Sequence, residues 1–489
     1  MKKIKIKPQR VTAQAVTRFF TEKMIMRKIN VIPLPNKITY LGGETETAAP
    51  ETSVCESLGE EEYILTVDKD GTKLAGGSEK ALFYGMQTLR QLGKSCPCIR
   101  IEDKPAFPYR GFMLDTVRHI FSIEDTKKLI DAAASVKMNV MHWHLTDDQG
   151  FRFFSSRRTD ATKKGSVREK SNFGKLKESG SYGGYFTPEE MKEIVDYCAE
   201  RYITVIPEFD IPGHTSAMLH AYPHLSCTGG PIDIKTCQGI FDDILCAGKD
   251  ETFETVFDIL SDIIEIFPSE YIHIGGDEAP KKRWKNCPDC QKRIADEGLK
   301  NEEELQGWFT NKVVEFLESN GRKSVVWNES LRSGLVKNSL VQMWMDRKKD
   351  SVAYANKGGK IIVSDFFHYY CDYPYGMTPL AKTYNFDPIL KGIKNSNSVV
   401  GVEAPIWTEY INNFDRLCFM CFPRFTAVAE TGWTEKQNKN VGDFCRRFEK
   451  YSDILSEIGI TPSPASEWNP SPLKRLKIIS FLLGLLDRE

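Results

Sequence analysis

The chain has 489 residues, of which 41% are hydrophobic and 27% are charged, as is usual for globular proteins. Its 66 basic and 67 acidic residues leave a formal net charge of -1, which favours neither a nucleic acid nor a membrane surface as a partner. No apolar run reaches the roughly 18 residues that a membrane-spanning helix requires, so we expect no membrane association.

The N-terminal residues and the cysteines bear on the cellular setting. The stretch from Met1 to Pro8 alternates lysine with isoleucine and lacks the apolar segment of a secretion signal. A second possible start at Met26 opens a strand-like run, so residues 1–25 are interpreted as an N-terminal extension. The 13 cysteines are odd in number and too sparse for a disulfide scaffold, which favours a reducing, cytoplasmic location.

Residues 26–104 are predicted to form a small α+β domain. Apolar runs have the composition of strands at 28–32, 62–67 and 99–103. Residues 78–92 place alanine, leucine and methionine at helical spacing. Two X-Pro pairs within 104–108 then mark a domain boundary.

The next segment, residues 105–460, is predicted to be an α/β domain, a (β/α)8 TIM barrel. Eight short apolar segments begin near residues 111, 138, 203, 271, 324, 340, 360 and 399. Because helical patterns fill most of the gaps, the chemistry is expected on the carboxyl-terminal face of the barrel. The gap between the fifth and sixth strands is short, so any helix there must be small or irregular. Long segments at about 149–187 and 211–250 are expected to shape the pocket.

The C-terminal tail, residues 461–489, begins rich in proline and serine and then becomes amphipathic. Apolar residues recur from Leu473 to Leu486. We expect a terminal helix that docks on the barrel, and a membrane-surface or partner helix is the alternative.

An acidic pair closes the short apolar segment Tyr271-Ile-His-Ile-Gly-Gly-Asp277-Glu278. The two glycines permit a sharp turn or the close approach of another group. Adjacent carboxylates repel each other when both are ionised, so one tends to keep its proton near neutral pH, which suits a general acid. The alternative is an acidic helix N-terminus with Asp277 as the N-cap.

Tryptophans and carboxylates also gather at the ends of other predicted strands. Trp327, Trp344 and Trp407 each lie at or near such an end, and Glu409 follows the last of them. The CH-rich face of a sugar packs on aromatic rings, while carboxylates and arginine bind its hydroxyls. The pattern therefore favours a sugar pocket over simple core packing.

Four ordered motifs carry a resemblance to a known family. They are Tyr109–His119, Trp143–Gly150, Ile206–His214 and His273–Glu278. They resemble glycoside hydrolase family 20, the β-N-acetylhexosaminidases, over residues 26 to about 450. The resemblance implies an exo-acting, retaining enzyme without a cofactor that removes terminal GlcNAc or GalNAc from an oligosaccharide or glycan. It also implies substrate-assisted catalysis, in which the 2-acetamido oxygen attacks the anomeric carbon and gives an oxazolinium intermediate.

The resemblance further implies individual roles. Glu278 would protonate the leaving oxygen and then activate water, and Asp277 would hold the acetamido N–H. Asp147 and His214 would form a pair that supports the acid. Strand parity by itself does not decide between Asp147 and Asp148, so the choice of Asp147 comes from the family pattern.

The sugar-binding residues are implied in the same way. Hydroxyl binders would be Arg110, Asp372 and Glu409, and the acetamido oxygen would meet Tyr370. The pocket walls would include Trp344 and Trp407, and Trp327 would also contact the substrate. The family commonly has a third wall tryptophan near the end of the seventh strand. This chain has Phe366 and Phe367 there, so either a phenylalanine replaces it or the wall opens.

Other interpretations remain open. A lacto-N-biosidase-like enzyme that releases a disaccharide would use the same catalytic residues. A metal-dependent amidohydrolase barrel would explain the spacing of His142 and His144, although no further histidine clearly completes a cluster. A carbohydrate-binding barrel without catalysis would be expected to have lost the acid. Finally, Cys287 and Cys290 resemble half a zinc site, but no second Cys-x-x-Cys follows.

Overall fold

The computed structural model describes residues 29–169, 172–173, 176–177, 180–345, 348–476 and 478. The chain divides into two compact units, and the division falls between Asp103 and Lys104, except that residues 32–34 belong to the second unit. In the part of the chain that is described, no helix combines the length and apolarity needed to cross a bilayer.

The first unit is a five-stranded sheet with one helix, in the order β1-β5-β3-β4-β2. Its elements are β1 (Lys37–Glu46), β2 (Glu51–Val54), β3 (Tyr63–Asp68), β4 (Gly71–Gly76), α2 (Glu79–Leu92) and β5 (Ser95–Asp103). The Ser78 side chain caps α2 by accepting from the Ala81 amide. The predicted strands at 62–67 and 99–103 and the predicted helix are therefore confirmed.

The strand predicted at 28–32 is wrong. Ile29, Val31 and Ile32 are buried, but the described residues of this run form no strand. Pro33 and Pro35 follow at once, and a proline has no amide hydrogen for a sheet ladder. The first strand begins only at Lys37.

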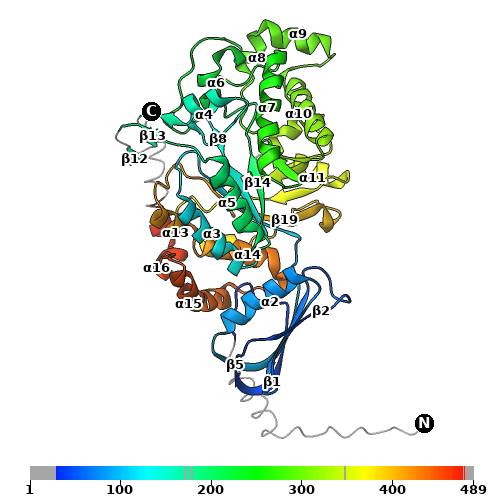
Figure 1. The fold of residues 1–489 in the computed structure, drawn as a ribbon, viewed down its shortest axis with the longest axis vertical. Helices are drawn as coiled ribbons and strands as arrows, with labels where there is room; N and C mark the ends of the chain where they lie inside the picture. The colour runs from blue at the N-terminus through cyan, green and yellow to red at the C-terminus, as the bar shows by residue number, and fades with distance from the viewer. Residues whose placement is uncertain are drawn as a thin grey trace, which may run out of the picture. The chain divides into compact units, whose positions relative to one another are not determined.

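The second unit contains a closed barrel of eight parallel strands (Figure 1). The strands are β6 (Tyr109–Asp115), β7 (Val140–His144), β14 (Thr204–Glu208), β15 (Tyr271–His273), β16 (Lys323–Trp327), β17 (Leu340–Met343), β18 (Ile361–Val363) and β19 (Val399–Ile406). The last strand pairs with the first and closes the cylinder, with Gly401 opposite Tyr109. All eight predicted segments are strands, which confirms the TIM barrel.

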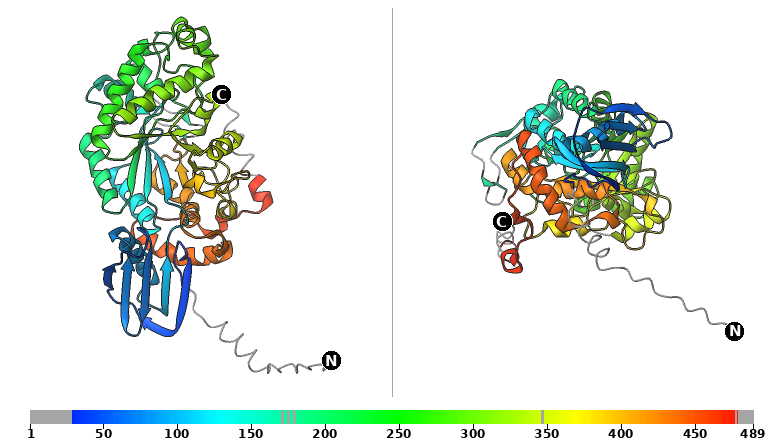
Figure 2. Two further views of the ribbon diagram at one scale, coloured as in Figure 1. Left: turned by 90° about the vertical axis from the view of Figure 1, so that its right-hand side faces the viewer. Right: turned by 90° about the horizontal axis from the view of Figure 1, so that it is seen from below.

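Helices surround these strands (Figure 1, Figure 2). The longer ones are α3 (Ile123–Ser135), α5 (Pro188–Ala199), α7 (Asp250–Ile266), α10 (Glu302–Ser319), α11 (Lys348–Asn356), α14 (Arg424–Trp433) and α15 (Val441–Glu457). A capping box between Thr187 and Glu190 starts α5. Between β16 and β17 lies only the 3-10 helix η2 (Asn328–Ser333), as the short gap predicted.

Short elements fill the loops at the ends of the barrel. The helical ones are α4 (Thr159–Gly165), α6 (Ser216–Ala221), η1 (Pro223–Leu225), α8 (Lys282–Asn286), α9 (Pro288–Asp296), α12 (Leu380–Asn385), η3 (Ser396–Ser398), α13 (Phe414–Cys421), η4 (Lys436–Asn438) and α16 (Ala465–Trp468). The extended ones are β8 (Thr146–Asp147), β9 (Gly150–Phe151), β10 (Val167–Arg168), β11 (Asn172–Phe173), β12 (Leu176–Lys177) and β13 (Tyr182–Gly183).

The expected terminal helix falls mostly outside the described residues. Two of its apolar residues are described, and both are exposed, Leu473 at 75% and Leu476 at 64%. Neither of these leucines is docked on the barrel.

Candidate active site

The two glycines before the acidic pair form a turn that only glycine fits. Gly275 has φ of 62° and Gly276 has φ of 103°, a region that L side chains rarely adopt. A β-carbon on Gly275 would lie 1.6 Å from Asp210 Oδ1, and one on Gly276 would lie 2.2 Å from Ser330 Oγ. The Gly276 amide instead donates to Asp210 Oδ1 at 3.0 Å. The turn thereby fixes where Asp277 and Glu278 stand at the end of β15.

The acidic pair faces one histidine. His214 Nε2 lies 3.5 Å from Glu278 Oε2 and 3.9 Å from Asp277 Oδ2. Both His214 (φ 52°) and Glu278 (φ 43°) have left-handed backbone conformations, which are costly and are found at functional sites. The N-cap alternative for Asp277 is wrong, because the next helix, α8, has Lys281 at its N-cap.

Asp277 is held in a buried, acidic surrounding. Asp277 is 7% exposed, and its Oδ1 is buried without a hydrogen-bond partner. Burial and the nearby charge of Asp210 raise the pKa of Asp277 well above its usual range. Burial also raises the pKa of Asp210 itself, to about 7. An unpaired, buried carboxyl oxygen is ready to accept a hydrogen bond from a substrate.

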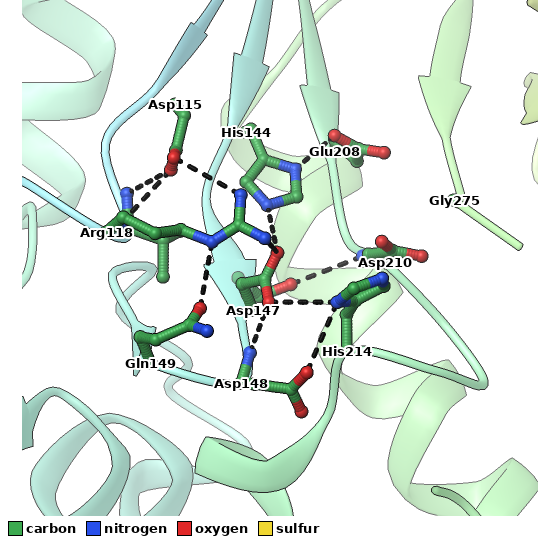
Figure 3. A network of polar contacts seen from close by, with 12 residues as sticks. Asp115, Arg118, His144, Asp147, Asp148, Gln149, Glu208, Asp210, His214 and Gly275 are labelled. Atoms are coloured by element: carbon green, nitrogen blue, oxygen red, sulfur yellow. Dashed lines mark hydrogen bonds and ion pairs between the residues drawn. The ribbon is translucent and has the colours of Figure 1, made fainter. Parts of the chain in front are cut away.

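Behind His214 lie two aspartates, Asp147 and Asp148, which Figure 3 shows with their contacts. His214 Nδ1 is 3.1 Å from Asp147 Oδ1 and 3.2 Å from Asp148 Oδ2. Asp147 also contacts His144 Nε2 at 2.9 Å and Arg118 Nη2 at 2.8 Å, whereas Asp148 Oδ1 accepts from the Ser216 amide at 2.9 Å. Both aspartates therefore reach the histidine, and Asp147 is the one that joins it to the arginine.

The charges of Asp147 and His214 stabilise each other. Burial alone would raise the pKa of Asp147, but Arg118 and His214 hold it well below its usual range. Burial likewise opposes the charge of His214, yet the ion pair with Asp147 raises its pKa well above its usual range. The site thus contains an imidazolium between a carboxylate and the proposed acid.

Arg118 is a site residue that the sequence analysis missed. Its Nε donates to Gln149 Oε1 at 2.8 Å and its Nη1 to Asp115 Oδ2 at 3.3 Å (Figure 3). Nη1 also lies 3.9 Å from Glu409 Oε1, and the guanidinium stacks 4.9 Å from the Trp407 ring. The rule that polar residues following a barrel strand form the site applies to Arg118 and could have found it.

The prediction that Arg110 binds the substrate is wrong. Arg110 is at the amino end of β6, fully buried, and its Nε donates to the Lys137 carbonyl at 2.9 Å. Its Nη1 donates to the Phe107 carbonyl at 2.9 Å. Because catalytic groups of a barrel lie at the carboxyl ends of its strands, Arg110 has a structural role at the opposite end.

Aromatic residues form one side of the site. Trp344, Tyr370 and Trp327 share a cluster, and Trp407 packs against it. Trp344 stacks on Tyr370 at a centroid distance of 6.2 Å, and Phe366 meets the edge of Tyr370 at 5.1 Å. A phenylalanine therefore stands beside Trp344 and Tyr370 near the end of β18, and Phe367 is 47% exposed.

Trp327 has a different surrounding from the other tryptophans. It is only 1% exposed, and its indole N–H donates to Glu208 Oε1 at 2.8 Å. Its ring packs against Trp407 at 6.1 Å. The structure gives it a packing role behind Trp407 instead of the predicted contact with substrate.

Asp372 and Glu409 are two acidic groups that lie close enough for their charges to interact. Burial raises the pKa of both, and the charge of Glu409 adds to the effect on Asp372. Asp372 Oδ1 is buried without a hydrogen-bond partner. Carboxyl groups can accept hydrogen bonds from sugar hydroxyls, so this role stays a prediction for both residues.

The histidines inside the barrel are paired with carboxylates. His142 lies between Glu208 Oε2 and Glu403 Oε1, each at 3.1 Å. His144 lies between Glu208 and Asp147. Both imidazoles thus contact the same Glu208 carboxylate, and together they connect strands β7, β14 and β19.

Comparisons with known proteins decide the family. Residues 107–436 match the glycosyl hydrolase family 20 catalytic domain, and residues 44–104 match domain 2 of the same family. The chain belongs to glycosyl hydrolase family 20. The resemblance seen in the four motifs is therefore confirmed, and the amidohydrolase alternative is replaced.

Individual family 20 proteins are similar along most of this chain. A beta-hexosaminidase of Porphyromonas gingivalis is 38% identical over 86% of this chain and 56% of its own length. A crystal structure of a beta-N-acetylhexosaminidase superposes with a TM-score of 0.84 at 30% identity, over 91% of this chain and 99% of that one. An exo beta-N-acetylglucosaminidase of Vibrio harveyi, solved with N-acetylglucosamine, gives 0.81 at 26% identity over 90% and 79%. The chain thus spans little more than half of the Porphyromonas relative.

Proposed function

We propose that this family 20 glycoside hydrolase is a retaining exo-β-N-acetylhexosaminidase that uses the acetamido group of its substrate as the nucleophile. The observation that carries the proposal is the position of Asp277 and Glu278 on one turn, both within 4 Å of the same His214 ring nitrogen. Ordinary retaining glycosidases need two carboxyl groups on opposite sides of the bond, about 5–5.5 Å apart. Consecutive residues on one turn do not suit that arrangement, so the nucleophile is assigned to the substrate.

In the first step Glu278 donates its proton to the leaving glycosidic oxygen. The acetamido oxygen attacks the anomeric carbon, the glycosidic bond breaks, and an oxazolinium ion forms. The unpaired Oδ1 of Asp277 accepts the acetamido N–H, and the carboxylate stabilises the positive charge that develops there. That positive charge opposes the effect of burial, which raises the pKa of Asp277.

In the second step a water molecule attacks the anomeric carbon and gives a proton to Glu278, while the bond from that carbon to the oxazolinium oxygen breaks and the acetamido group is restored. Two displacements at one carbon retain the β configuration. The Trp407 indole donates to the Tyr370 hydroxyl, which leaves the hydroxyl hydrogen of Tyr370 for the acetamido oxygen. Trp344 and Trp407 supply the apolar surface for the sugar ring.

The activities named for two relatives support this substrate class. The Porphyromonas relative is named a beta-hexosaminidase, and the Vibrio harveyi structure contains N-acetylglucosamine. Phe366, packed beside Trp344 and Tyr370, supports a closed wall and hence a pocket for one sugar.

Three aryl β-glycosides test the proposal: the N-acetylglucosaminide, the glucoside and the lacto-N-bioside. We expect cleavage of the first alone, since only it offers an acetamido group in a single-sugar pocket. Cleavage of the third alone would move the specificity to a disaccharide. Cleavage of the glucoside would contradict the role of the acetamido group, and no cleavage of any would favour a binding protein.

The substitution Glu278→Gln tests the acid. For substrates with poor leaving groups we expect kcat to fall by about 100- to 10,000-fold, the usual contribution of a general acid. An aryl substrate with a good leaving group should lose less in its first step, because it needs no proton. Glu303→Gln, on the exposed face of α10, is the control and should leave kcat unchanged. A Glu278→Gln variant with full activity on both substrates would disprove the assignment.

A further inference from the structure

Four cysteines from two separate loops meet at one point. Cys227 and Cys246 lie in the segment between β14 and α7, and Cys287 and Cys290 enclose the first turn of α9. Their four sulfur atoms all lie within 4.8 Å of one another. Three of these residues are buried and Cys227 is partly buried, so the cluster lies beneath the surface of the protein.

The spacing of the sulfurs is that of a shared metal ligand set. Cys246 Sγ is 3.5 Å from Cys290 Sγ and 3.6 Å from Cys287 Sγ, and Cys227 Sγ is 3.8 Å from Cys290 Sγ. A zinc ion bound tetrahedrally at about 2.3 Å from each sulfur places the sulfurs about 3.8 Å apart. A disulfide would bring one pair to about 2.05 Å. No pair is singled out here, as four ligands of one ion would require.

The backbone around the cluster is packed as tightly as the sulfurs. A β-carbon on Gly248 would lie 2.2 Å from the Asp289 carbonyl carbon and 2.4 Å from the Cys290 amide nitrogen. The turn after Cys246 therefore rests directly on the turn between Cys287 and Cys290, and only glycine fits. The Gly248 amide also donates to the Cys246 sulfur, the kind of second contact that orients a thiolate ligand.

Basic side chains surround the cluster. Arg293 Nη2 donates to the Gly248 carbonyl at 3.2 Å, and Lys249 Nζ donates to the Ser226 carbonyl at 2.8 Å. Arg283 is paired with Asp243 at 2.8 Å and lies close enough to Cys227 to interact electrostatically with a thiolate there. A divalent ion with four thiolates carries two net negative charges, which such neighbours stabilise.

We propose that Cys227, Cys246, Cys287 and Cys290 bind one structural zinc ion. Four protein ligands leave no open position, so the site is structural and takes no part in the reaction. The ion joins the segment after β14, which carries His214, to the segment after β15, which carries Asp277 and Glu278. It thereby holds the supporting histidine and the acid at a fixed separation. Sequence patterning found only the half of the site formed by Cys287 and Cys290, because Cys227 and Cys246 do not form a second Cys-x-x-Cys pair.

Metal analysis of the purified protein tests this proposal independently of any glycosidase activity. The protein is prepared under reducing conditions without chelator, and its metals are measured by inductively coupled plasma mass spectrometry. We expect about one zinc per chain in the wild type, as for a closed four-cysteine site. The variants Cys246→Ser and Cys290→Ser should lose the zinc. The control Cys418→Ser, a buried thiol on α13, should keep it.

Cobalt substitution keeps the test decisive if a cysteine variant fails to fold. In the wild type, cobalt(II) in place of zinc should give strong thiolate-to-metal absorption and the visible bands of a tetrahedral site. Zinc should also leave as a mercurial reagent modifies these thiols. Protein that has neither zinc nor these bands after exposure to each ion would overturn the proposal. Bound iron would overturn the choice of metal, and disulfides among the four cysteines, detected by mass spectrometry, would overturn the site.

All 13 cysteines of the chain are free thiols in the structure. Reduced thiols are what a zinc site needs, because the thiolate is the ligand. The reducing, cytoplasmic location stays a prediction, and it agrees with this requirement.

Discussion

At the scale of single residues, two arginines show what a motif leaves open. Arg110 and Arg118 belong to the same motif, but Arg110 lies at the amino end of β6 and Arg118 follows its carboxyl end. The strand carries them to opposite ends of the barrel: Arg110 binds backbone carbonyls, and Arg118 reaches Asp147 at 2.8 Å. The residue type fits sugar binding in both cases, and only the position on the barrel separates them.

The substitution Arg118→Lys should therefore impair the site. A lysine cannot keep the contacts of the guanidinium with Asp115, Asp147 and Gln149 together. We expect kcat/KM to fall about 100-fold, which corresponds to the roughly 3 kcal/mol lost when a buried ion pair is broken. With the charge held less closely, the pKa of Asp147 rises, so the acid limb of the pH–kcat profile should move to higher pH.

Arg110→Lys is the matched control for this experiment. It should lower the melting temperature, because three backbone carbonyls lose part of their donor set, but leave KM and the pH profile unchanged. If Arg118→Lys also lowered the melting temperature but left KM and the pH profile unchanged, Arg118 would have a structural role and would not belong to the active site.

At the scale of elements, strands β7, β14 and β19 are joined by buried charges inside the barrel. His142 on β7 contacts Glu208 on β14 and Glu403 on β19. Burial opposes the charge of His142, but the two carboxylates raise its pKa to about 9. Since parallel strands normally present apolar residues on both faces, this polar interior couples strand packing to protonation.

The stability of the barrel should consequently depend on pH. An unfolded histidine has a pKa of about 6.5, so between that value and about 9 the folded state binds a proton that the unfolded state releases. The contribution is fully present below the lower value and is lost as pH rises through the upper one. The free energy of unfolding should fall across this window by up to about 3 kcal/mol.

Urea unfolding at several pH values across the window measures this effect. In Glu403→Gln the pKa of His142 should return toward its usual value, so the decrease with pH should become smaller. Glu449→Gln on α15 is the control and should keep the wild-type dependence. Equal slopes in wild type and Glu403→Gln would show that the network does not determine the pH dependence.

At the scale of the whole molecule, the first and last strands of the barrel approach each other closely where they close the cylinder. A β-carbon on Gly401 of β19 would lie 1.8 Å from the Tyr109 carbonyl oxygen of β6. Both partners are backbone, so neither can move without opening the seam between the strands.

Gly401→Ala should therefore destabilise the protein by at least about 3 kcal/mol, in the upper range for single substitutions. Thermal unfolding followed by circular dichroism measures the loss. Gly442→Ala on α15 is the control, because its β-carbon meets only the Asn440 side chain at 3.4 Å, and alanine favours helix there. Unchanged melting of Gly401→Ala would mean that the seam has room that the structure does not show.

The amino-acid sequence by itself determined the alternation of strands and helices, the turn at Gly275 and Gly276, and the family. These features depend on local patterns: apolar periodicity, helix caps and residues with special backbone freedom. The strand predicted at 28–32 failed because strand formation requires a pairing partner, which a local apolar run does not reveal. For the same reason, the sequence identified the carboxyl groups of the site but not the residues that surround them.

Only the tertiary structure decided which residues meet. It placed Arg118 instead of Arg110 at Asp147, buried Trp327 behind Trp407, and set Phe366 against Trp344 and Tyr370. It also brought four cysteines from two distant loops to one point. Most of these contacts join segments that are far apart in the chain, and their distances follow from barrel closure and loop packing. Side-chain chemistry was readable in the sequence, but the geometry that gives it a function is a property of the folded chain.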